Sequence, residues 1–145
     1  MQFYFETFRI ECTHPFGISR SSHDYYDIVY VYLEHEGLLG RGEAAPSGRY
    51  NESTDRILSL LKKGINIPDQ LDDPALFSQQ LSSQCDKIKA LEVAFSMATL
   101  DLWCQIHQQP LYKYFNADPT QTPLTSFTIS IGDMDLLPKK IEDAN

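Results

Sequence analysis

Hydrophobic and polar positions along the first third of the chain predict three antiparallel β-strands. Residues 2–12 are rich in aromatic and β-branched side chains, which are typical of strands. Residues 27–36 place apolar or aromatic side chains on both alternating faces, a pattern that predicts a strand covered on both sides. A Glu-His-Glu-Gly turn leads into residues 38–45, so we expect a three-stranded meander. A polar loop over residues 14–23 is expected to join its first two strands.

Helical spacing of apolar residues follows the meander and predicts three helices. The first is expected over residues 51–63, with its first residue, an asparagine, as the N-cap. The second is expected over residues 73–83, because an Asp-Pro pair supplies a cap followed by proline at the first helical position. The third, residues 86–107, is apolar almost all round, which is typical of a buried helix. Its isolated acids, Glu92 and Asp101, therefore need polar partners or water.

The remaining sequence predicts one further strand and helix. Pro110 ends the third helix, and residues 111–115 predict a short helical turn. Residues 123–131 predict a strand, and Gly132 begins a helix-like segment. The order is β-β-β-α-α-α followed by β-α, which is an α+β fold. Gly40 and Gly42, inside the third strand, indicate a bulge or the close approach of another part of the backbone.

Composition narrows the classes of function. With 145 residues, of which 42% are hydrophobic and 22% charged, the chain has the make-up of a globular domain with its own core. The formal net charge of −8 argues against nucleic acid or an anionic membrane surface as a partner. Three cysteines without a CxxC pair argue against a disulfide scaffold, and the first residues do not resemble a signal peptide. We therefore expect a cytoplasmic protein.

Two loops carry the side chains best suited to binding a small molecule. Each combines an arginine with large apolar side chains and borders a strand of the meander. Arginine offers a planar fork to a carboxylate, and Phe16, Ile18 or Tyr50 could supply apolar walls. Spacing alone favours the alternative, two ordinary surface loops with solvated arginines. The four histidines lack zinc-site spacing, and no GxGxxG, P-loop or GxSxG motif is present, so no metal or nucleotide site is predicted.

Four stretches of sequence occur in an order that is specific for one enzyme superfamily. They are Gly17-Ile-Ser-Arg, Gly42-Glu-Ala-Ala-Pro, the pair Ala98-Thr-Leu-Asp-Leu-Trp and Pro110-Leu-Tyr-Lys-Tyr-Phe, and Thr125-Ser-Phe-Thr-Ile-Ser-Ile. Together they resemble the N-terminal part of an enolase-superfamily enzyme. Within the muconate-lactonising subgroup of that superfamily, the resemblance is greatest to the dipeptide epimerases (L-Ala-D/L-Glu epimerase-like).

The resemblance implies two parts. Residues 1–120 would be an enolase-type capping domain, in which the helices form a layer on the meander. Residues 121–145 would be the first β-α unit of an incomplete TIM barrel. In this family the catalytic lysines and the three carboxylates that bind Mg²⁺ lie on barrel strands, and none of them has a counterpart in this sequence. The resemblance therefore implies no catalytic and no metal-binding residue here, assigns Mg²⁺ to the parent enzyme, and makes an isolated piece of 145 residues inactive.

The resemblance also implies a substrate and a role for the two loops. The parent enzyme would epimerise dipeptides by α-proton abstraction and reprotonation. The loops over residues 14–23 and 46–51 would close over the mouth of the barrel. Arg20 would face the side-chain carboxylate of the substrate. The other residues expected to contact the dipeptide are Phe16, Ile18, Tyr50 and Thr128.

Two alternatives remain open from the sequence. The first is another substrate within the same superfamily, as in muconate cycloisomerase or o-succinylbenzoate synthase. The second is a self-contained α+β binding module without catalytic activity. For an enzyme fragment we expect a homo-oligomer, formed through an exposed strand over residues 124–131, whereas the binding module would be a monomer.

Overall fold

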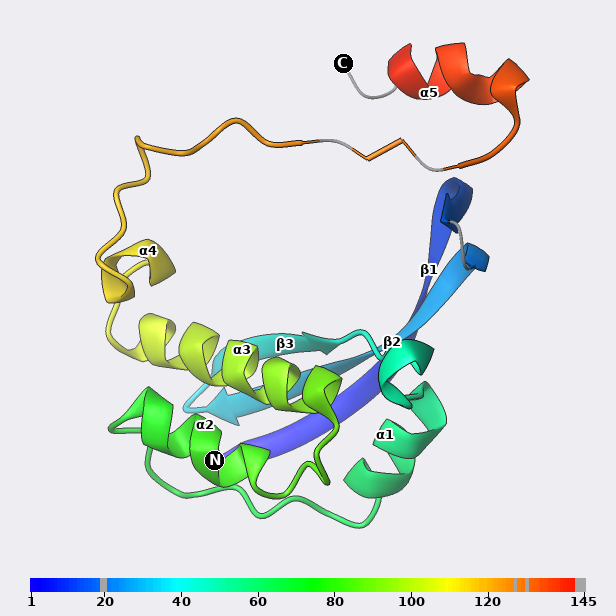
Figure 1. Ribbon diagram of the computed structural model, residues 1–145. Coiled ribbons are helices and arrows are strands. Elements are labelled where there is room, and N and C mark those ends of the chain that lie inside the picture. Colours follow the sequence, from blue (N-terminus) through cyan, green and yellow to red (C-terminus); the bar gives the residue numbers. More distant parts are fainter. Residues whose placement is uncertain (19–20, 127, 130, 143–145) are drawn as a thin grey trace. The chain divides into compact units, whose positions relative to one another are not determined.

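The computed structural model describes residues 1–18, 21–126, 128–129 and 131–142 (Figure 1). Among these residues, no helix combines the length and apolar character needed to cross a membrane. The strands are β1 (Gln2–Ile18), β2 (Ser21–His35) and β3 (Leu38–Ala44). The helices are η1 (Gly48–Tyr50), α1 (Thr54–Leu61), α2 (Pro74–Ser82), α3 (Lys89–Ile106), α4 (Leu111–Tyr114), η2 (Met134–Leu136) and α5 (Leu137–Glu142). The order of elements through α4 agrees with the sequence-based prediction.

The chain divides into two compact units. The first unit consists of Met1–Phe8 and Asp27–Pro119, and the second of Arg9–Tyr26 and Thr120–Asn145. Strands β1 and β2 therefore each contribute residues to both units. The first unit contains the predicted meander and helix layer, and the second contains the far part of the β1–β2 hairpin.

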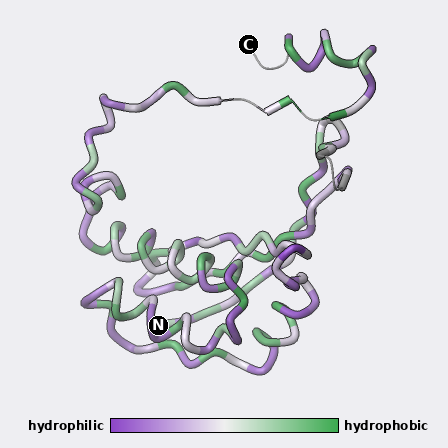
Figure 2. Tube along the Cα trace, in the orientation of Figure 1, coloured by the Kyte–Doolittle hydropathy of each residue, from purple (hydrophilic) through white to green (hydrophobic). Residues whose placement is uncertain are grey.

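The first unit is built on a sheet in the order β1-β2-β3, with helix α3 packed on β3 and against α2 (Figure 1). Hydrophobic and hydrophilic residues alternate along its helices (Figure 2). The inner faces of the strands and helices meet in one buried core, which includes Val29, Val31, Leu33, Ile57, Phe77, Leu91, Phe95 and Leu102. The other face of the sheet carries tyrosines. Tyr4 stacks on Tyr32 with ring centroids 4.7 Å apart, and Tyr4 is 43% exposed, so this face is open to solvent rather than covered as expected.

Close packing of α3 on β3 depends on the two glycines inside the strand. A Cβ atom on Gly42 would lie 1.8 Å from the carbonyl oxygen of Ala94, and one on Gly40 would lie 2.2 Å from that of Ala98. The β2–β3 register is uninterrupted through both glycines. The prediction of a close backbone approach is therefore confirmed, and there is no bulge at these positions.

The two isolated acids of α3 have polar partners, as expected. Asp101 Oδ2 accepts a hydrogen bond from the backbone N–H of Arg41 at 2.9 Å. Glu92 forms an ion pair with Lys89, with 2.7 Å between Oε2 and Nζ. One turn beyond Asp101, the amide of Gln105 donates to Leu39 O at 2.7 Å. Asp101 and Gln105 thereby satisfy backbone groups along β3, which lies at the edge of the sheet.

Helix boundaries follow local capping. Asp73 caps α2 as predicted, accepting hydrogen bonds from the N–H groups of Ala75 and Leu76 at 2.8 and 3.1 Å. Helix α1 begins later than predicted, because Ser53 is its N-cap. Asn51 instead ends η1 in the left-handed conformation, with φ of 58°. Helix α3 also begins late, at Lys89, because the two residues at 86 and 87 have positive φ angles of 49° and 60°.

The second unit differs from the prediction in two places. Residues 14–18 and 21–23 belong to strands rather than to a polar loop. Pro15, Phe16, Ser22 and His23 are exposed in this two-stranded ribbon, and a strand face open to solvent accepts polar residues as readily as a loop does. Residues 123–126 and 128–129 are not in a strand, and in the described part of this segment only Ile131 forms a bridge, with Gly17. A strand requires a paired neighbour for its backbone, and propensity alone does not supply one.

Candidate functional site

The end of the β1–β2 hairpin carries the first group of predicted binding residues. Phe16 lies on β1 and is 37% exposed, and Ile18 is the last residue of β1. Arg20, predicted to face a substrate carboxylate, lies outside the described residues. Farther along the hairpin, the Arg9 guanidinium lies 3.8 Å from the ring centroid of Tyr25. This cation–π contact links β1 to β2.

A backbone bridge joins this hairpin to the segment that carries Thr128. The N–H of Ile131 donates to the carbonyl oxygen of Gly17 at 2.8 Å. A Cβ atom on Gly17 would lie 2.5 Å from Ile131 O, so only glycine permits this approach. Thr128 is exposed and lies a few residues before the bridge. The structure therefore joins the segments that hold Phe16, Ile18 and Thr128.

Tyr50 belongs to the other unit, on the turn η1. Its side chain is 67% exposed, and the Arg49 guanidinium lies 5.9 Å from its ring centroid. The turn is held by local hydrogen bonds. Ser47 Oγ accepts from Arg49 N–H at 3.4 Å, and Tyr50 N–H donates to Ser47 O at 2.9 Å. Tyr50 thus projects from a regular turn rather than from an irregular loop.

Glu52, which the sequence analysis did not single out, fixes this turn to the start of α3. The residue is 8% exposed. Its Oε1 accepts hydrogen bonds from the N–H groups of Lys89 at 2.6 Å and Ala90 at 3.3 Å. Its Oε2 lies 3.5 Å from the N–H of Ser47. The sequence predicted this helix to begin at residue 86. The need for an acceptor therefore became visible only in the structure, where Ile88 precedes α3 and cannot cap it.

Arg56 forms a second tether on the same turn. Its Nη1 donates to Asn51 O at 3.1 Å. Its Nη2 contacts the carbonyl oxygen and the carboxylate of Asp86, at 3.2 and 3.0 Å. Arg56 therefore connects the end of η1, helix α1 and the residues before α3.

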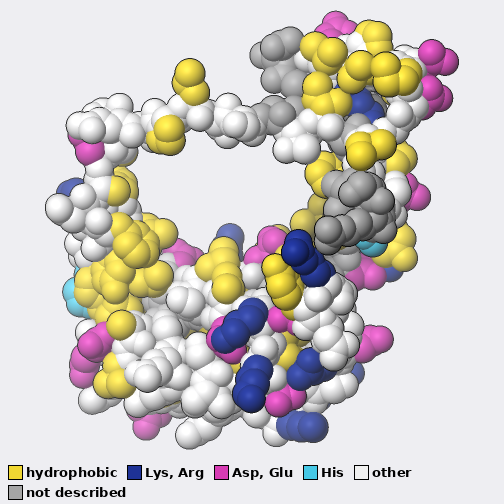
Figure 3. Space-filling model, in the orientation of Figure 1, with side chains coloured by type: hydrophobic (Ala, Val, Ile, Leu, Met, Phe, Trp, Pro, Cys, Tyr) yellow, Lys and Arg dark blue, Asp and Glu magenta, His cyan; other side chains and the backbone are white. Residues whose placement is uncertain are grey.

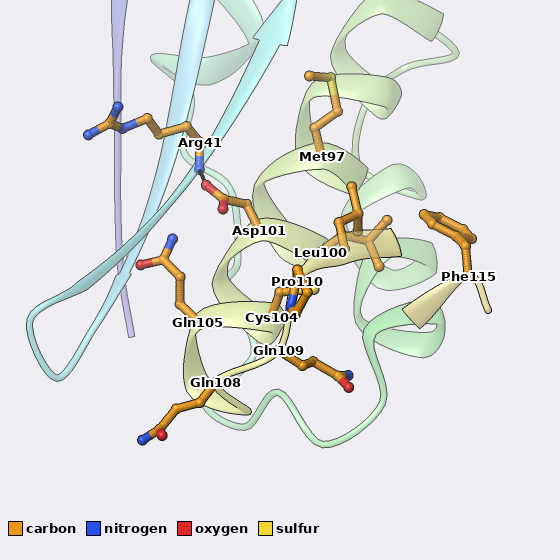
Figure 4. A pocket seen from close by; sticks show the side chains of 11 residues that line it. Arg41, Met97, Leu100, Asp101, Cys104, Gln105, Gln108, Gln109, Pro110 and Phe115 are labelled. Atoms are coloured by element: carbon orange, nitrogen blue, oxygen red, sulfur yellow. Dashed lines mark hydrogen bonds between the residues drawn. The ribbon is translucent and has the colours of Figure 1, made fainter. Parts of the chain in front are cut away.

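A hollow of about 810 Å³ lies elsewhere in the first unit, between β3, the end of α3 and the start of α4 (Figure 4). Hydrophobic side chains also gather over the end of α3 and α4 in Figure 3. The apolar residues that line the hollow are Met97, Leu100, Cys104, Pro110, Leu111 and Phe115. Its polar lining is Arg41, Asp101, Gln105, Gln108 and Gln109. None of the predicted binding residues lines this hollow.

The titratable groups near this hollow and in the core do not form a reactive centre. Burial raises the pKa of the Cys104 thiol, and the Asp101 charge raises it further. Burial raises the pKa of Cys85 to about 12. Both thiols are therefore protonated near neutral pH and are weak nucleophiles. Among the residues that the structure describes, no group of three His, Cys, Asp or Glu side chains could hold a metal ion.

The curated relatives of this chain are epimerases. The chain is 30% identical over 146 residues to the L-Ala-D/L-Glu epimerase of Bacteroides thetaiotaomicron, covering 99% of this chain and 38% of that protein. It is 28% identical over 148 residues to the L-Ala-D/L-amino acid epimerase of Maribacter sp., covering 99% and 43%. The chain matches the N-terminal part of dipeptide epimerases of the enolase superfamily. It spans about two fifths of the length of these dipeptide epimerases. No family model matches the chain.

Solved dipeptide epimerases share the fold. The structure from Methylococcus capsulatus, complexed with Mg and L-Arg-D-Lys, superposes with a TM-score of 0.86 at 22% identity, covering 99% of this chain and 42% of that one. The structure from Cytophaga hutchinsonii, complexed with Mg and D-Ala-L-Val, gives 0.79 at 24% identity, covering 98% and 39%. The α+β fold, with its meander and helix layer, is therefore that of the N-terminal part of dipeptide epimerases, as predicted.

Proposed function

We propose that this chain is the substrate-capping part of a magnesium-dependent enzyme that epimerises dipeptides. The observation that carries the proposal is the match over 99% of the chain to relatives named as epimerases of Ala-Glu or Ala-amino acid dipeptides. The fold shared with solved dipeptide epimerases supports it. In this proposal residues 1–120 are the capping domain, and residues 121–145 begin a barrel domain.

The chemical step belongs to the rest of the enzyme. Described residues of this chain offer no cluster of carboxylates or imidazoles that fits Mg²⁺. The solved relatives from M. capsulatus and C. hutchinsonii contain Mg. We therefore assign the metal, and the groups that remove and return the α-proton, to parts of the parent enzyme that this chain does not include. The chain alone would be inactive.

The contribution of this chain is to bind and enclose the substrate. Phe16 and Ile18, on the hairpin end, would exclude water from one side of the dipeptide. Arg20 would provide a planar fork for an acidic side chain of the substrate. Tyr50 would supply a further apolar wall, and Thr128 would offer a hydroxyl to the peptide.

The Gly17–Ile131 bridge gives this enclosure a physical basis. It ties the hairpin end, with Phe16 and Ile18, to the segment that would become the first barrel strand. A hairpin attached in this way can hold its side chains over a bound substrate without a large ordering cost.

Chromatographic separation of dipeptide diastereomers tests the proposal. The natural full-length protein, purified with Mg²⁺, is incubated with L-Ala-L-Glu and with a panel of other L-Ala dipeptides. We expect conversion of at least one member into its D-containing epimer. Absence of conversion across the whole panel would contradict the proposed function.

A further inference from the structure

The turn that carries Tyr50 is attached to a buried acid rather than left free. Glu52 lies two residues after the end of η1 and is 8% exposed. A buried carboxylate is costly unless hydrogen bonds compensate it. Glu52 has such partners, because Lys89 and Ala90 donate to Oε1 at 2.6 and 3.3 Å.

The position of Glu52 at the start of α3 suits a negative charge. The first N–H groups of a helix lack partners within the helix, and the helix dipole favours an anion there. Ile88, the residue before α3, makes no side-chain cap hydrogen bond. Glu52 therefore supplies the cap from a position 37 residues earlier in the chain.

The same carboxylate also reaches back to the turn. Its second oxygen, Oε2, lies 3.5 Å from the N–H of Ser47, which is the N-cap of η1. Arg56 holds the other end of the turn through Asn51 O at 3.1 Å. The turn between these tethers is thus fixed at both ends, although the Tyr50 ring itself is 67% exposed.

We propose that Glu52 is a positioning residue that holds Tyr50 in place for the substrate. The inference rests on the proposed function, in which Tyr50 contacts the dipeptide. By joining the η1 turn to the rigid start of α3, Glu52 removes the need to order this loop when substrate binds. Preorganisation of this kind improves binding by lowering the entropic cost of association. Glu52 itself touches no reacting atom.

Two substitutions in the natural full-length enzyme test the inference. Glu52→Ala removes both sets of hydrogen bonds. Glu52→Gln keeps the shape and one acceptor oxygen, but removes the charge and places an NH₂ group among N–H donors. We expect KM for the preferred dipeptide to rise about 10-fold in Glu52→Ala and about 3-fold in Glu52→Gln, with kcat within about 2-fold of wild type.

Leu33→Val is the matched control for loss of stability. Leu33 is fully buried and pairs with Gly40, near the β2–β3 turn. The chain leads to η1 from the opposite end of β3, at Ala44, so this substitution should leave the η1 turn unchanged. This variant should be destabilised without a change in KM. If both Glu52 variants have wild-type KM, or show the same changes as Leu33→Val, the inference is wrong.

Hydrogen exchange separates this inference from the proposed function. Amides of residues 47–51 should exchange faster in Glu52→Ala than in wild type or Leu33→Val. Unchanged exchange in Glu52→Ala would overturn the tether, whatever the enzyme catalyses. Faster exchange in a protein that converts no dipeptide would support the tether, but would overturn both its role toward substrate and the proposed function.

Discussion

Gly42 lies directly against the backbone of Ala94, so that a Cβ atom on the glycine would stand 1.8 Å from the Ala94 carbonyl oxygen. That oxygen belongs to α3 and cannot swing aside as the end of a flexible side chain could. The contact sets how closely α3 packs on β3, and with it the position of the α3 start to which Glu52 binds.

Gly42→Ala should therefore destabilise the protein strongly. The added methyl group must push α3 away from β3, and overpacking of this kind costs about 1–3 kcal/mol. Urea unfolding should show a lower midpoint with an unchanged slope. Gly48→Ala is the matched control, because nothing lies within 4 Å of a Cβ atom at that position. Equal midpoints for the two variants would contradict the packing described above.

Gly17→Ala should open the bridge between the hairpin and Ile131. A Cβ atom at Gly17 would stand 2.5 Å from Ile131 O, which is closer than two such atoms can approach. We expect faster hydrogen exchange at the Ile131 amide and weaker binding of substrate. Gly132→Ala is the control, since its nearest obstacle is the flexible end of Lys140 at 3.0 Å. Protection of the Ile131 amide that survives in Gly17→Ala would show that the bridge is not essential.

Arg20→Met should alter substrate choice rather than general activity. This prediction rests on the resemblance of the sequence to dipeptide epimerases, because Arg20 lies outside the described residues. Loss of a charge-assisted hydrogen bond should lower kcat/KM for L-Ala-L-Glu about 10- to 100-fold. A neutral dipeptide such as L-Ala-L-Leu serves as the internal control and should lose little. Equal losses of kcat/KM on both dipeptides would show that Arg20 does not recognise the substrate carboxylate.

Alkaline pH should destabilise the fold through Cys85. Burial raises the pKa of this thiol from 9.0 to about 12, while the unfolded chain keeps the ordinary value. Above pH 9 the unfolded state therefore releases its proton first, and stability falls as pH rises toward 12. Urea midpoints measured from pH 7 to 11 should decline above about pH 9 in wild type, and less steeply in Cys85→Ala. The same decline in both proteins would assign the effect to other groups.

Sequence patterns predicted the fold where the deciding signals are local. The Asp73-Pro74 pair fixes the start of α2, and both glycines of β3 correctly indicated a close backbone approach. The boundaries of α1 and α3 were less accurate. Helix α1 begins later than predicted because Ser53, rather than Asn51, is its N-cap. Helix α3 begins later because the positive φ angles before Lys89 are not helical.

The predictions failed where pairing between distant segments decides the structure. The polar residues of the hairpin end resemble a loop because a ribbon exposed to solvent needs no apolar pattern. Residues 123–131 have strand-like composition, but of the described ones only Ile131 is paired. Glu52 was missed because its partners, Lys89 and Ala90, lie far along the chain. Phe16, Ile18 and Thr128 lie on segments joined by the Gly17–Ile131 bridge, and their contact with a substrate stays a prediction.

Exchange of the substrate α-proton with solvent tests the central claim most directly. The natural full-length protein with Mg²⁺ is incubated with L-Ala-L-Glu in D₂O and followed by ¹H NMR. Epimerisation through proton abstraction predicts loss of the α-proton signal of the second residue, together with the appearance of L-Ala-D-Glu. Retention of that signal, for L-Ala-L-Glu and for every other dipeptide tested, would contradict the assignment of this chain to a dipeptide-epimerising enzyme.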